Sequence, residues 1–559
     1  MSSARPINEP TPTAALADAS AIMQAAGRIW ERIEAWLEWI GDWLNPILVK
    51  ETRQALKSRQ FSLTFLLVLI ACWVVTMGGV ALIGPGIYYS ASGSTLLLCY
   101  FVVLAFPLTI VVPYSAFRSL AAEREDNTFD MLSITTLKPR QIISGKLGSA
   151  ITQMAVYFSA VTPCLAFTYL LRGVDVPTIG VLLIYVFFGS LGLSMIGLLL
   201  ATLTRQRYSQ VFVSVLFIAG LLGTFMGAIG LAGEVISMSY MFVADVWFWI
   251  GTLALFTAWA TTFVLAFFAA AGMLTFNSEN RSTPLRIAML VQQACWVGWM
   301  GGIWAYETYD LNFAMFMVVM AGLYWFAMGS MLTGERPEMS QRVKRGLPST
   351  ALGRLFFTWL NPGPASGYMF VIANSTALVA ILVIAVAVRS LIGTGGTGWP
   401  RGWEAICPTL VGWGYLIAYL GVGRLVIAAL RRVTTVNMPA AVLIQLLLVL
   451  AGSGIPSSIQ WMSVELRELD YTYLQLTNPI WTLHYLVDAG LPSDAVALLL
   501  LVTTAAICVV LLNLPGVIRE IRHLRVALPS RVADDELQLH PLPAPLPTSP
   551  WDDAATTSN

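Results

Sequence analysis

Apolar and polar positions form long alternating blocks along this chain. Apolar blocks of about 20 residues, the length that crosses roughly 30 Å of hydrocarbon, are separated by shorter polar stretches. They lie near residues 62–83, 95–117, 147–171, 178–203, 209–231, 246–275, 287–306, 312–332, 368–393, 406–430, 438–456 and 493–515. The pattern therefore predicts an all-α polytopic membrane protein with about twelve transmembrane helices.

The N-terminal segment 20–44 has a different pattern. Its apolar residues recur at three or four positions, with acidic residues on the other face. We expect a helix lying in the inner membrane interface; the alternative is a helix packed on other protein. Its expected interfacial anchors are Trp30, Trp36, Trp39 and Trp43. Asn45 as a cap and Pro46 in a first turn predict a second, basic helix that leads into the first span beside anionic lipid headgroups.

The basic residues predict the orientation of the chain. With the N-terminus inside, sixteen Lys and Arg residues fall in the inner loops. The outer loops then hold only Arg172, Arg401 and Arg467. Because short cytoplasmic loops carry the excess of Lys and Arg, both termini are expected inside.

Four regions follow from these patterns. Residues 1–60 form a cytosolic N-terminus with the interfacial helix, 61–276 and 277–515 form two six-span units, and 516–559 form a largely disordered cytosolic tail. The tetrapeptide WLNP occurs at 43–46 and again at 359–362, each time ahead of a span, so the second unit is a candidate degenerate repeat of the first. The outer loop near 457–492 is long enough for one or two short helices.

Composition and charge narrow the function classes. The chain is 57% hydrophobic and 11% charged, against about 25% charged residues in soluble domains. A net charge of +1 argues against nucleic acid as a partner. The six cysteines lie in or beside apolar runs without CxxC spacing, and the three histidines are far apart without an HExxH motif. We therefore assign no catalytic residue and no metal ligand, which disfavours an intramembrane enzyme.

The segment between the second and third apolar blocks is rich in charge. Nine charged residues lie from Arg118 to Lys146, both included. Two short helices are expected there, one interrupted near Asn127 and one beginning at Pro139. Apolar residues such as Phe129 and Leu132 are interspersed among the charges, as in a docking surface with apolar anchors and a charged rim. The alternative is a solvated loop that only satisfies the positive-inside rule.

This segment resembles the cytosolic loop of type-2 ATP-binding-cassette (ABC) exporter permeases. That family often shows Glu-Arg-Glu-x-Gly-Thr-Leu-Glu, a Leu-rich turn and a closing Gly-Lys. The matching residues are Glu123, Arg124, Glu125, Thr128, Phe129, Asp130, Leu132, Thr135, Leu137, Gly145 and Lys146. The stretch NPILVKETRQALKSRQF also resembles the family's opening, with Asn45, Pro46, Lys50, Glu51 and Arg59 in place. The resemblance covers about residues 43–230.

The chain departs from the family pattern at three places. Asn127 stands where Gly is usual, and Thr136 stands where Pro is often found. The second half has no second acidic coupling segment, because its corresponding loop, RRVTTVNM, is short. Either one chain supplies both halves of a transporter, or two chains pair as a homodimer or with a second permease chain.

The resemblance implies the permease subunit of an ABC exporter in a bacterial cytoplasmic membrane, with 61–276 as the ABC permease-like unit. A separate ABC ATPase subunit would bind ATP and Mg and dock near 118–146. The expected ATPase-coupling residues are Glu123, Glu125, Asp126, Asn127, Thr128, Phe129, Leu132, Leu137, Pro139 and Lys146. The chain itself contains no G-x-x-x-x-G-K-[ST] loop, so we expect it to bind no cofactor and not to be an enzyme by itself.

Two other functions fit the same class of protein. A secondary transporter usually needs ionisable groups at mid-membrane, whereas Arg389 and Arg424 lie near span ends, where long side chains can reach the interface. A non-transporting membrane scaffold or mechanotransmitting subunit is compatible with the whole sequence. The scarcity of charge in the spans favours an apolar or amphipathic cargo.

Overall fold

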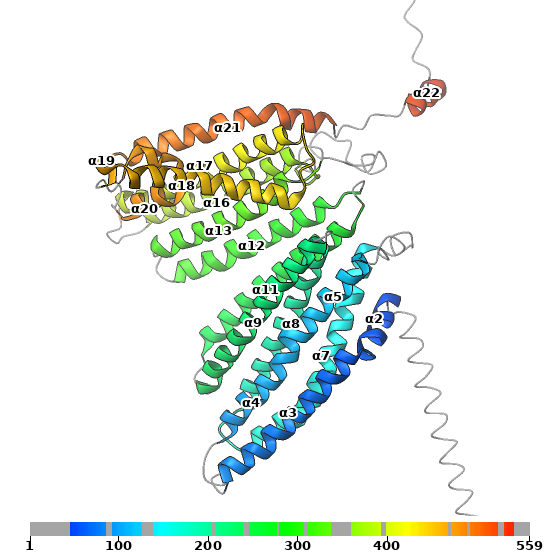
Figure 1. The fold of residues 1–559 in the computed structure, drawn as a ribbon. Helices are drawn as coiled ribbons and strands as arrows, with labels where there is room; N and C mark the ends of the chain where they lie inside the picture. The colour runs from blue at the N-terminus through cyan, green and yellow to red at the C-terminus, as the bar shows by residue number, and fades with distance from the viewer. Residues whose placement is uncertain are drawn as a thin grey trace, which may run out of the picture. The chain divides into compact units, whose positions relative to one another are not determined.

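A computed structural model describes residues 45–84, 92–125, 138–203, 207–238, 245–276, 279–306, 311–336, 359–392, 399–467, 471–488, 492–523 and 530–540. All regular structure in these residues is helical. The chain divides into two compact units, one made of 1–276 with 284–299 and the other of 277–283 with 300–559. Figure 1 shows the helices of each unit.

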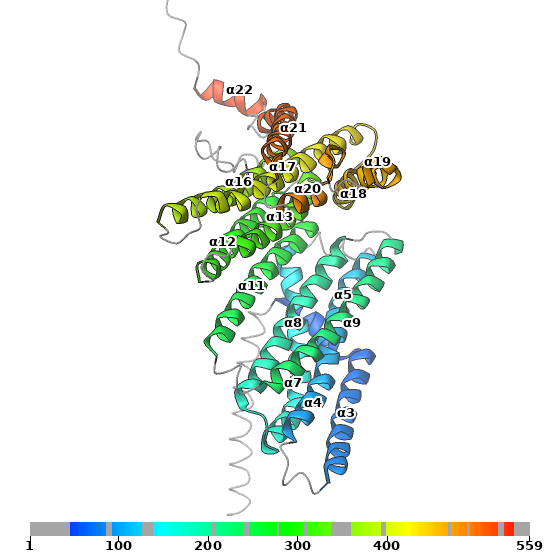
Figure 2. The same cartoon turned by 90° about the vertical axis from the view of Figure 1, so that its left-hand side faces the viewer.

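The first unit is a bundle of long helices preceded by one short helix. Its helices are α2 (Pro46–Leu56), α3 (Arg59–Ile83), α4 (Gly93–Phe106), α5 (Val112–Glu125), α7 (Pro139–Leu170), α8 (Val176–Leu203), α9 (Arg207–Ser237) and α11 (Val246–Leu274). Helix α4 packs against α3, α7 and α9, and α5 packs against α8. The short helix α2 packs against the beginning of α7 (Figure 1). Figure 2 shows the long helices α3, α4, α7, α8 and α9 of this unit side by side.

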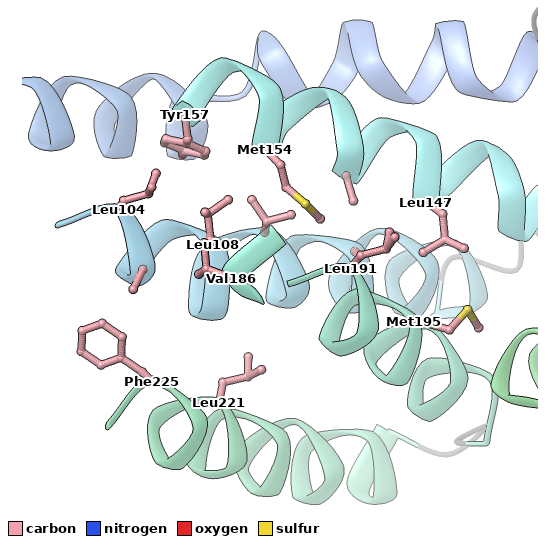
Figure 3. Packing of buried hydrophobic residues seen from close by; sticks show 14 of the residues in the cluster. Leu104, Leu108, Leu147, Met154, Tyr157, Val186, Leu191, Met195, Leu221 and Phe225 are labelled. Carbon is pink, nitrogen blue, oxygen red and sulfur yellow. The ribbon is translucent and has the colours of Figure 1, made fainter. Parts of the chain in front are cut away.

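The interior of this unit is apolar and closely packed. Leu104 and Leu108 face Met154 and Tyr157 of α7, while Leu221 approaches from α9 (Figure 3). Tight interdigitation of this kind, rather than a hydrophobic driving force, holds helices together within lipid. The outward face of α3 is apolar as well: Leu66, Leu67 and Trp73 are exposed. That face requires an apolar medium around it, as a membrane supplies.

Helix α4 continues into α5 through a wide turn. Residues Pro107–Val111 are π-helical, and the whole run Gly93–Glu125 is helical for 33 residues. Pro107 has no backbone N–H to donate to the preceding turn, and π-turns commonly absorb such a break. In this register the donor for the carbonyl of Leu108 would be residue 113, which is also a proline, and that carbonyl instead accepts a hydrogen bond from Ser190 Oγ of α8. The second span therefore carries its helix beyond the apolar block to Glu125.

The second unit is built around α17 (Trp399–Leu430). Its other helices are α13 (Leu311–Thr333), α16 (Pro364–Ile392), α18 (Met438–Met462), α19 (Val464–Arg467), η3 (Tyr473–Thr477), α20 (Pro479–Asp488), α21 (Ala495–His523) and α22 (Ser530–Leu539). Helix α17 contacts α13, α16, α18, α20 and α21. One or two short helices were predicted near 457–492; the region contains the two short α-helices α19 and α20, with the 3-10 helix η3 between them.

Eleven helices in the described part of the chain are long and apolar enough to cross a membrane. The chain is thus a multi-pass membrane protein by helix length and hydropathy. The block near 287–306, predicted as a further span, forms the 25-residue helix α12 (Ser282–Tyr306) but is not among the eleven. Its polar Arg286, Gln292 and Gln293 lower its hydropathy.

Other predictions have mixed outcomes. Helix α2 begins at Pro46 with Asn45 as its cap, and α7 begins at Pro139, as predicted. Within the predicted tail 516–559, α21 continues to His523 and α22 occupies 530–539; the rest of the tail lies outside the described residues, and its disorder stays a prediction. The interfacial segment 20–44, with Trp30, Trp36, Trp39 and Trp43, lies outside the described residues, and the orientation of the chain stays a prediction.

Candidate functional site

The start of α2 is fastened to α7 by Asn45. Its Oδ1 accepts a hydrogen bond from the N–H of Ile47 at 3.1 Å and so caps α2. Its Nδ2 donates to the backbone carbonyl of Gln141 and to Ser144 Oγ on α7. The Asn45 side chain therefore satisfies a backbone donor at the N-terminus of α2 and also attaches α2 to α7.

Two glycines of α7 allow α2 to approach closely. A Cβ added at Gly145 would lie 2.8 Å from Ile47 Cγ2 and 3.2 Å from the backbone nitrogen of Leu48. A Cβ added at Gly148 would lie 2.6 Å from Leu48 Cδ1. At Gly145 a larger residue would meet Ile47 Cβ at 2.9 Å and the backbone of α2, so the two helices could not keep this separation, whereas at Gly148 the end of the Leu48 side chain would have to move.

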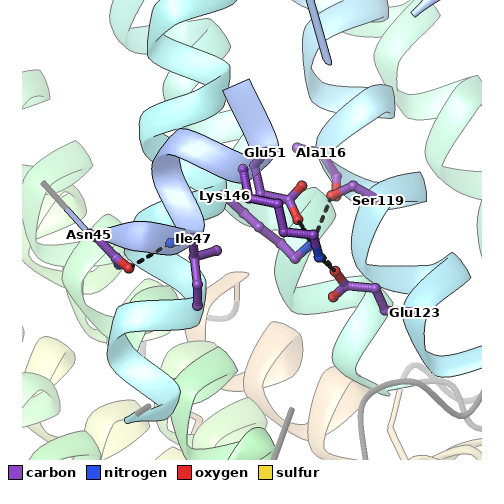
Figure 4. Close-up of polar contacts among 8 residues, drawn as sticks. Asn45, Ile47, Glu51, Ala116, Ser119, Glu123 and Lys146 are labelled. Atoms are coloured by element: carbon purple, nitrogen blue, oxygen red, sulfur yellow. Dashed lines mark hydrogen bonds and ion pairs between the residues drawn. The ribbon is translucent and has the colours of Figure 1, made fainter. Parts of the chain in front are cut away.

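A cluster of charged side chains completes this junction (Figure 4). Lys146 Nζ of α7 lies 3.1 Å from Glu51 Oε1 of α2 and 3.1 Å from Glu123 Oε1 of α5. It also donates to Ser119 Oγ at 3.4 Å. The Lys146 side chain is 1% exposed and that of Glu51 is 9% exposed. We call Glu51, Ser119, Glu123 and Lys146 the α2–α5–α7 junction.

A fourth charged residue lies at the rim of the junction. Lys50 Nζ is 3.8 Å from Glu123 Oε1 and 4.0 Å from Glu51 Oε1, with a side chain that is 60% exposed. The two lysines and two glutamates balance in charge. Because a buried charge is tolerated only with a partner in good geometry, Lys146 constrains the three helices to meet at this point.

The junction holds both flanks of the charge-dense segment. On the α5 side, Glu123 is ion-paired and Arg124 Nη1 donates to the carbonyl of Thr202 on α8 at 2.6 Å. On the α7 side, Lys138 is extended, as a residue before proline must be, and its N–H donates to Gln141 Oε1 at 2.9 Å. The end of α5 before residue 126 and the beginning of α7 after residue 137 are therefore both held by side-chain contacts.

The predicted coupling residues divide into three groups. Glu123 and Lys146 are brought together in the junction, while Glu125 and Pro139 lie at the two helix ends beside it. Asp126, Asn127, Thr128, Phe129, Leu132 and Leu137 lie outside the described residues. The coupling role of all ten residues stays a prediction.

Sequence reasoning did not assign a role to Glu51 or Ser119 in this site. A signal for Glu51 was present, because it is the one acidic residue between Pro46 and Arg59. Lys146 is similarly the one charged residue between Gln141 and Leu171. Glu51 is thus a single acid on a basic helix, and Lys146 is a single base in an apolar stretch of helix. Two isolated charges of opposite sign are a reason to test whether the two side chains pair.

A second polar cluster lies in the other unit, at the beginning of α16. Glu335 accepts hydrogen bonds from Ser282 Oγ at 2.8 Å and from the N–H of Gly363 at 3.1 Å. Glu520 of α21 accepts from the N–H of Ala365 at 2.8 Å. Two buried carboxylates thus each accept one backbone N–H at the N-terminus of this helix.

Arg424 of α17 belongs to the same region and corrects an expectation. We expected its side chain to reach the membrane interface, but the residue is 7% exposed. Its Nη1 donates to Asn513 Oδ1 at 2.7 Å, and it interacts electrostatically with Glu520. Because Asn513 and Glu520 lie beside it within the bundle, the buried guanidinium of Arg424 has a hydrogen-bond partner and an acidic neighbour.

Neither cluster has the composition of a metal site. Among the described residues, no group of three His, Cys, Asp or Glu side chains is arranged to hold a metal ion. Comparison with protein-family models, curated proteins and solved structures found no match to this chain. The resemblance to type-2 permeases therefore depends on the residues of 43–230 alone.

The cap at Asn45 gives a first prediction. Replacing Asn45 with Ala should destabilise the attachment of α2 by about 0.5–2 kcal/mol, because the N-terminal donors of the helix lose their acceptor. Amide hydrogen exchange over residues 46–56 in detergent would measure it as faster exchange confined to α2. Asn45→Ser is the matched control, since serine also caps; equal exchange in both variants and the unmodified protein would contradict the role of the cap.

Proposed function

We propose that this chain is the membrane-spanning permease subunit of an ABC-type exporter, driven by ATP hydrolysed in a separate ATPase subunit. The observation that supports the proposal is the α2–α5–α7 junction. It ties a basic amphipathic helix and both flanks of residues 126–137 into one group through Lys146. A partner that pushed on this segment would move α2, α5 and α7 together.

The predicted orientation places the junction where such a partner could reach it. With the N-terminus inside, α2 and the ends of α5 and α7 lie at the cytosolic face of a bacterial cytoplasmic membrane. The basic residues Lys50, Arg53 and Lys57 of α2 are exposed at the surface of the protein, where they suit anionic lipid headgroups or an acidic partner surface. ATP and Mg belong to the ATPase in this proposal, and this chain supplies the pathway and the docking surface.

The proposal predicts a specific loss of partner binding. Leu132→Asp places a charge among the proposed apolar anchors and should reduce recovery of a Walker-motif ATPase by roughly tenfold or more. The measurement is mild-detergent purification of the tagged chain from its native membranes, followed by quantitative mass spectrometry of co-purifying proteins. Membrane insertion should not change.

Leu537→Asp is the matched control, because Leu537 is an exposed leucine on α22, outside the candidate spans. It should leave ATPase recovery unchanged. A chain recovered without any ATPase, or an ATPase indifferent to Leu132→Asp, would refute the proposal in favour of a non-transporting scaffold. An ATPase recovered without ATP-dependent movement of cargo in reconstituted vesicles would support a mechanotransmitting subunit.

A further inference from the structure

An open groove of about 620 Å³ lies in the second unit between α18 and α20. Its lining residues are Leu450, Ser453, Gly454, Ser457, Asn478, Ile480, Trp481 and His484. The volume falls within the roughly 300–1,000 Å³ of pockets that bind small molecules. Leu450, Ile480 and Trp481 supply apolar walls, while two serines and an asparagine supply polar groups. The groove thus combines a largely apolar surface with a small polar base.

The polar base is held in place by its own hydrogen bonds. Asn478 Nδ2 donates to Ser457 Oγ at 3.1 Å and to Gln475 Oε1 at 3.0 Å. Asn478 Oδ1 accepts from the N–H groups of Ile480 and Trp481, each at 3.2 Å, and so caps α20. One residue therefore fixes α20 against α18 along the groove.

One polar group in the base lacks a protein partner. Ser453 Oγ is buried and makes no hydrogen bond within the protein. The other serines of this turn donate to the carbonyl four residues earlier, Ser457 to Ser453 at 2.8 Å and Ser458 to Gly454 at 2.7 Å. Because a buried hydroxyl without a partner is unfavourable, rotation of the Ser453 side chain toward the groove would give a ligand one donor and one acceptor.

The wall formed by α20 is rigid. Tyr485 of α20 stacks on Tyr471 with ring centroids 4.3 Å apart, and Tyr415 Oη donates to the carbonyl of Leu476 at 2.6 Å. Burial raises the pKa of Tyr471, so its phenol stays protonated and bonded to Thr482 at 3.1 Å. The groove is therefore formed before any ligand arrives.

The surroundings of the groove indicate the chemistry of its ligand. Along α18, Leu446, Leu450 and Ile455 are exposed and apolar, as a surface in contact with lipid tails must be. No carboxylate, ammonium or guanidinium group is among the eight lining residues. A charged head would find no carboxylate, ammonium or guanidinium here, and His484 is the one titratable residue in the lining, whereas an uncharged hydroxyl or ester group would match Ser453.

We propose that this groove binds an uncharged amphiphile from the bilayer. Its hydroxyl or ester oxygen bonds to Ser453, and its apolar chain lies along Leu450 and Ile480. The ring of Trp481, apolar with one polar edge, suits the boundary between head and chain. A diacylglycerol and a long-chain isoprenoid alcohol share this chemistry. The inference does not depend on an ATPase partner, since the groove and its ligand involve the second unit alone.

Photolabelling of the full chain in phosphatidylcholine vesicles tests the proposal. The probes are diazirine-bearing diacylglycerol, polyprenol and phosphatidylglycerol, with labelled peptides identified by mass spectrometry. We expect one or both neutral probes to label residues 450–457 and 478–484. Gly454→Phe should reduce this labelling roughly tenfold, and Ser453→Ala roughly fivefold, through loss of space and of one hydrogen bond respectively.

Gly454→Phe is a suitable variant because a Cβ at this position meets no atom within 4 Å. Gly322→Phe on α13 is its matched control, since Gly322 is equally unobstructed and lies away from the groove lining. Labelling by diacylglycerol alone assigns a glycerolipid, and labelling by polyprenol alone assigns an isoprenoid alcohol. Labelling that Gly454→Phe leaves intact, that Gly322→Phe reduces equally, or that phosphatidylglycerol matches would overturn the proposal.

Discussion

Replacing Lys146 with methionine is expected to destabilise the first unit by about 3–5 kcal/mol, the usual consequence of breaking a buried ion pair. The substitution keeps an unbranched side chain, one atom shorter, and removes the cation that lies 3.1 Å from both Glu51 and Glu123. The two carboxylates would then face each other at a largely buried position. The thermal unfolding midpoint of the detergent-purified protein should fall by on the order of 10 °C.

Lys50→Met is the matched control for this prediction. Lys50 approaches the same two glutamates at 3.8 and 4.0 Å, but its side chain is 60% exposed. Exposed pairs contribute about 0–1 kcal/mol, so its midpoint should change little. Adding Glu51→Gln to Lys146→Met should restore part of the loss, because one charge of each sign is then absent. Equal midpoints for Lys146→Met and Lys50→Met would show that the junction does not stabilise the unit.

Gly363→Ala should destabilise the second unit by about 1–3 kcal/mol through Glu520. A Cβ at this position would lie 1.3 Å from Glu520 Oε1, so the carboxylate must move. Moving it breaks its hydrogen bonds from the N–H of Ala365 at 2.8 Å and from Ser366 Oγ at 3.3 Å. A thermal unfolding measurement in detergent would detect the loss.

A double-mutant cycle tests whether Glu520 is the cause. Glu520→Ala alone should cost about 3–5 kcal/mol, because it also leaves buried Arg424 without its acidic neighbour. Gly363→Ala should then add almost nothing to Glu520→Ala, since the displaced group is already gone. Gly322→Ala, where a Cβ meets no atom within 4 Å, is the control and should be neutral or slightly stabilising. Additive losses from Gly363→Ala and Glu520→Ala would mean that the alanine acts elsewhere.

Local signals in the sequence predicted several elements correctly. Asn45 followed by Pro46 predicted the start of α2, and Lys138 followed by Pro139 predicted the start of α7. These predictions succeed because a cap or a proline acts on backbone groups within a few residues. The π-turn at Pro107 and the closeness of α2 to Gly145 and Gly148 were not predicted, because both depend on which helix packs alongside.

The candidate site was predicted only in part. The sequence indicated the region 118–146 and included Glu123 and Lys146, but as separate charges on a docking surface. The structure pairs them with each other and with Glu51. Similarly, Arg424 was expected at a membrane interface and instead bonds to Asn513. A charged residue's role depends on whether an opposite charge or a polar partner lies beside it after folding.

The sequence by itself determined that this is an all-helical, multi-pass membrane protein, and it located most of the spans. Hydrocarbon imposes that requirement locally, since every stretch inside it must be apolar and must satisfy its own backbone hydrogen bonds. Only the tertiary structure decided which polar groups meet. Lys146 and Glu51 are separated by 95 residues, and Ala365 and Glu520 by 155. Contacts over such distances follow from how helices pack, which no local pattern records.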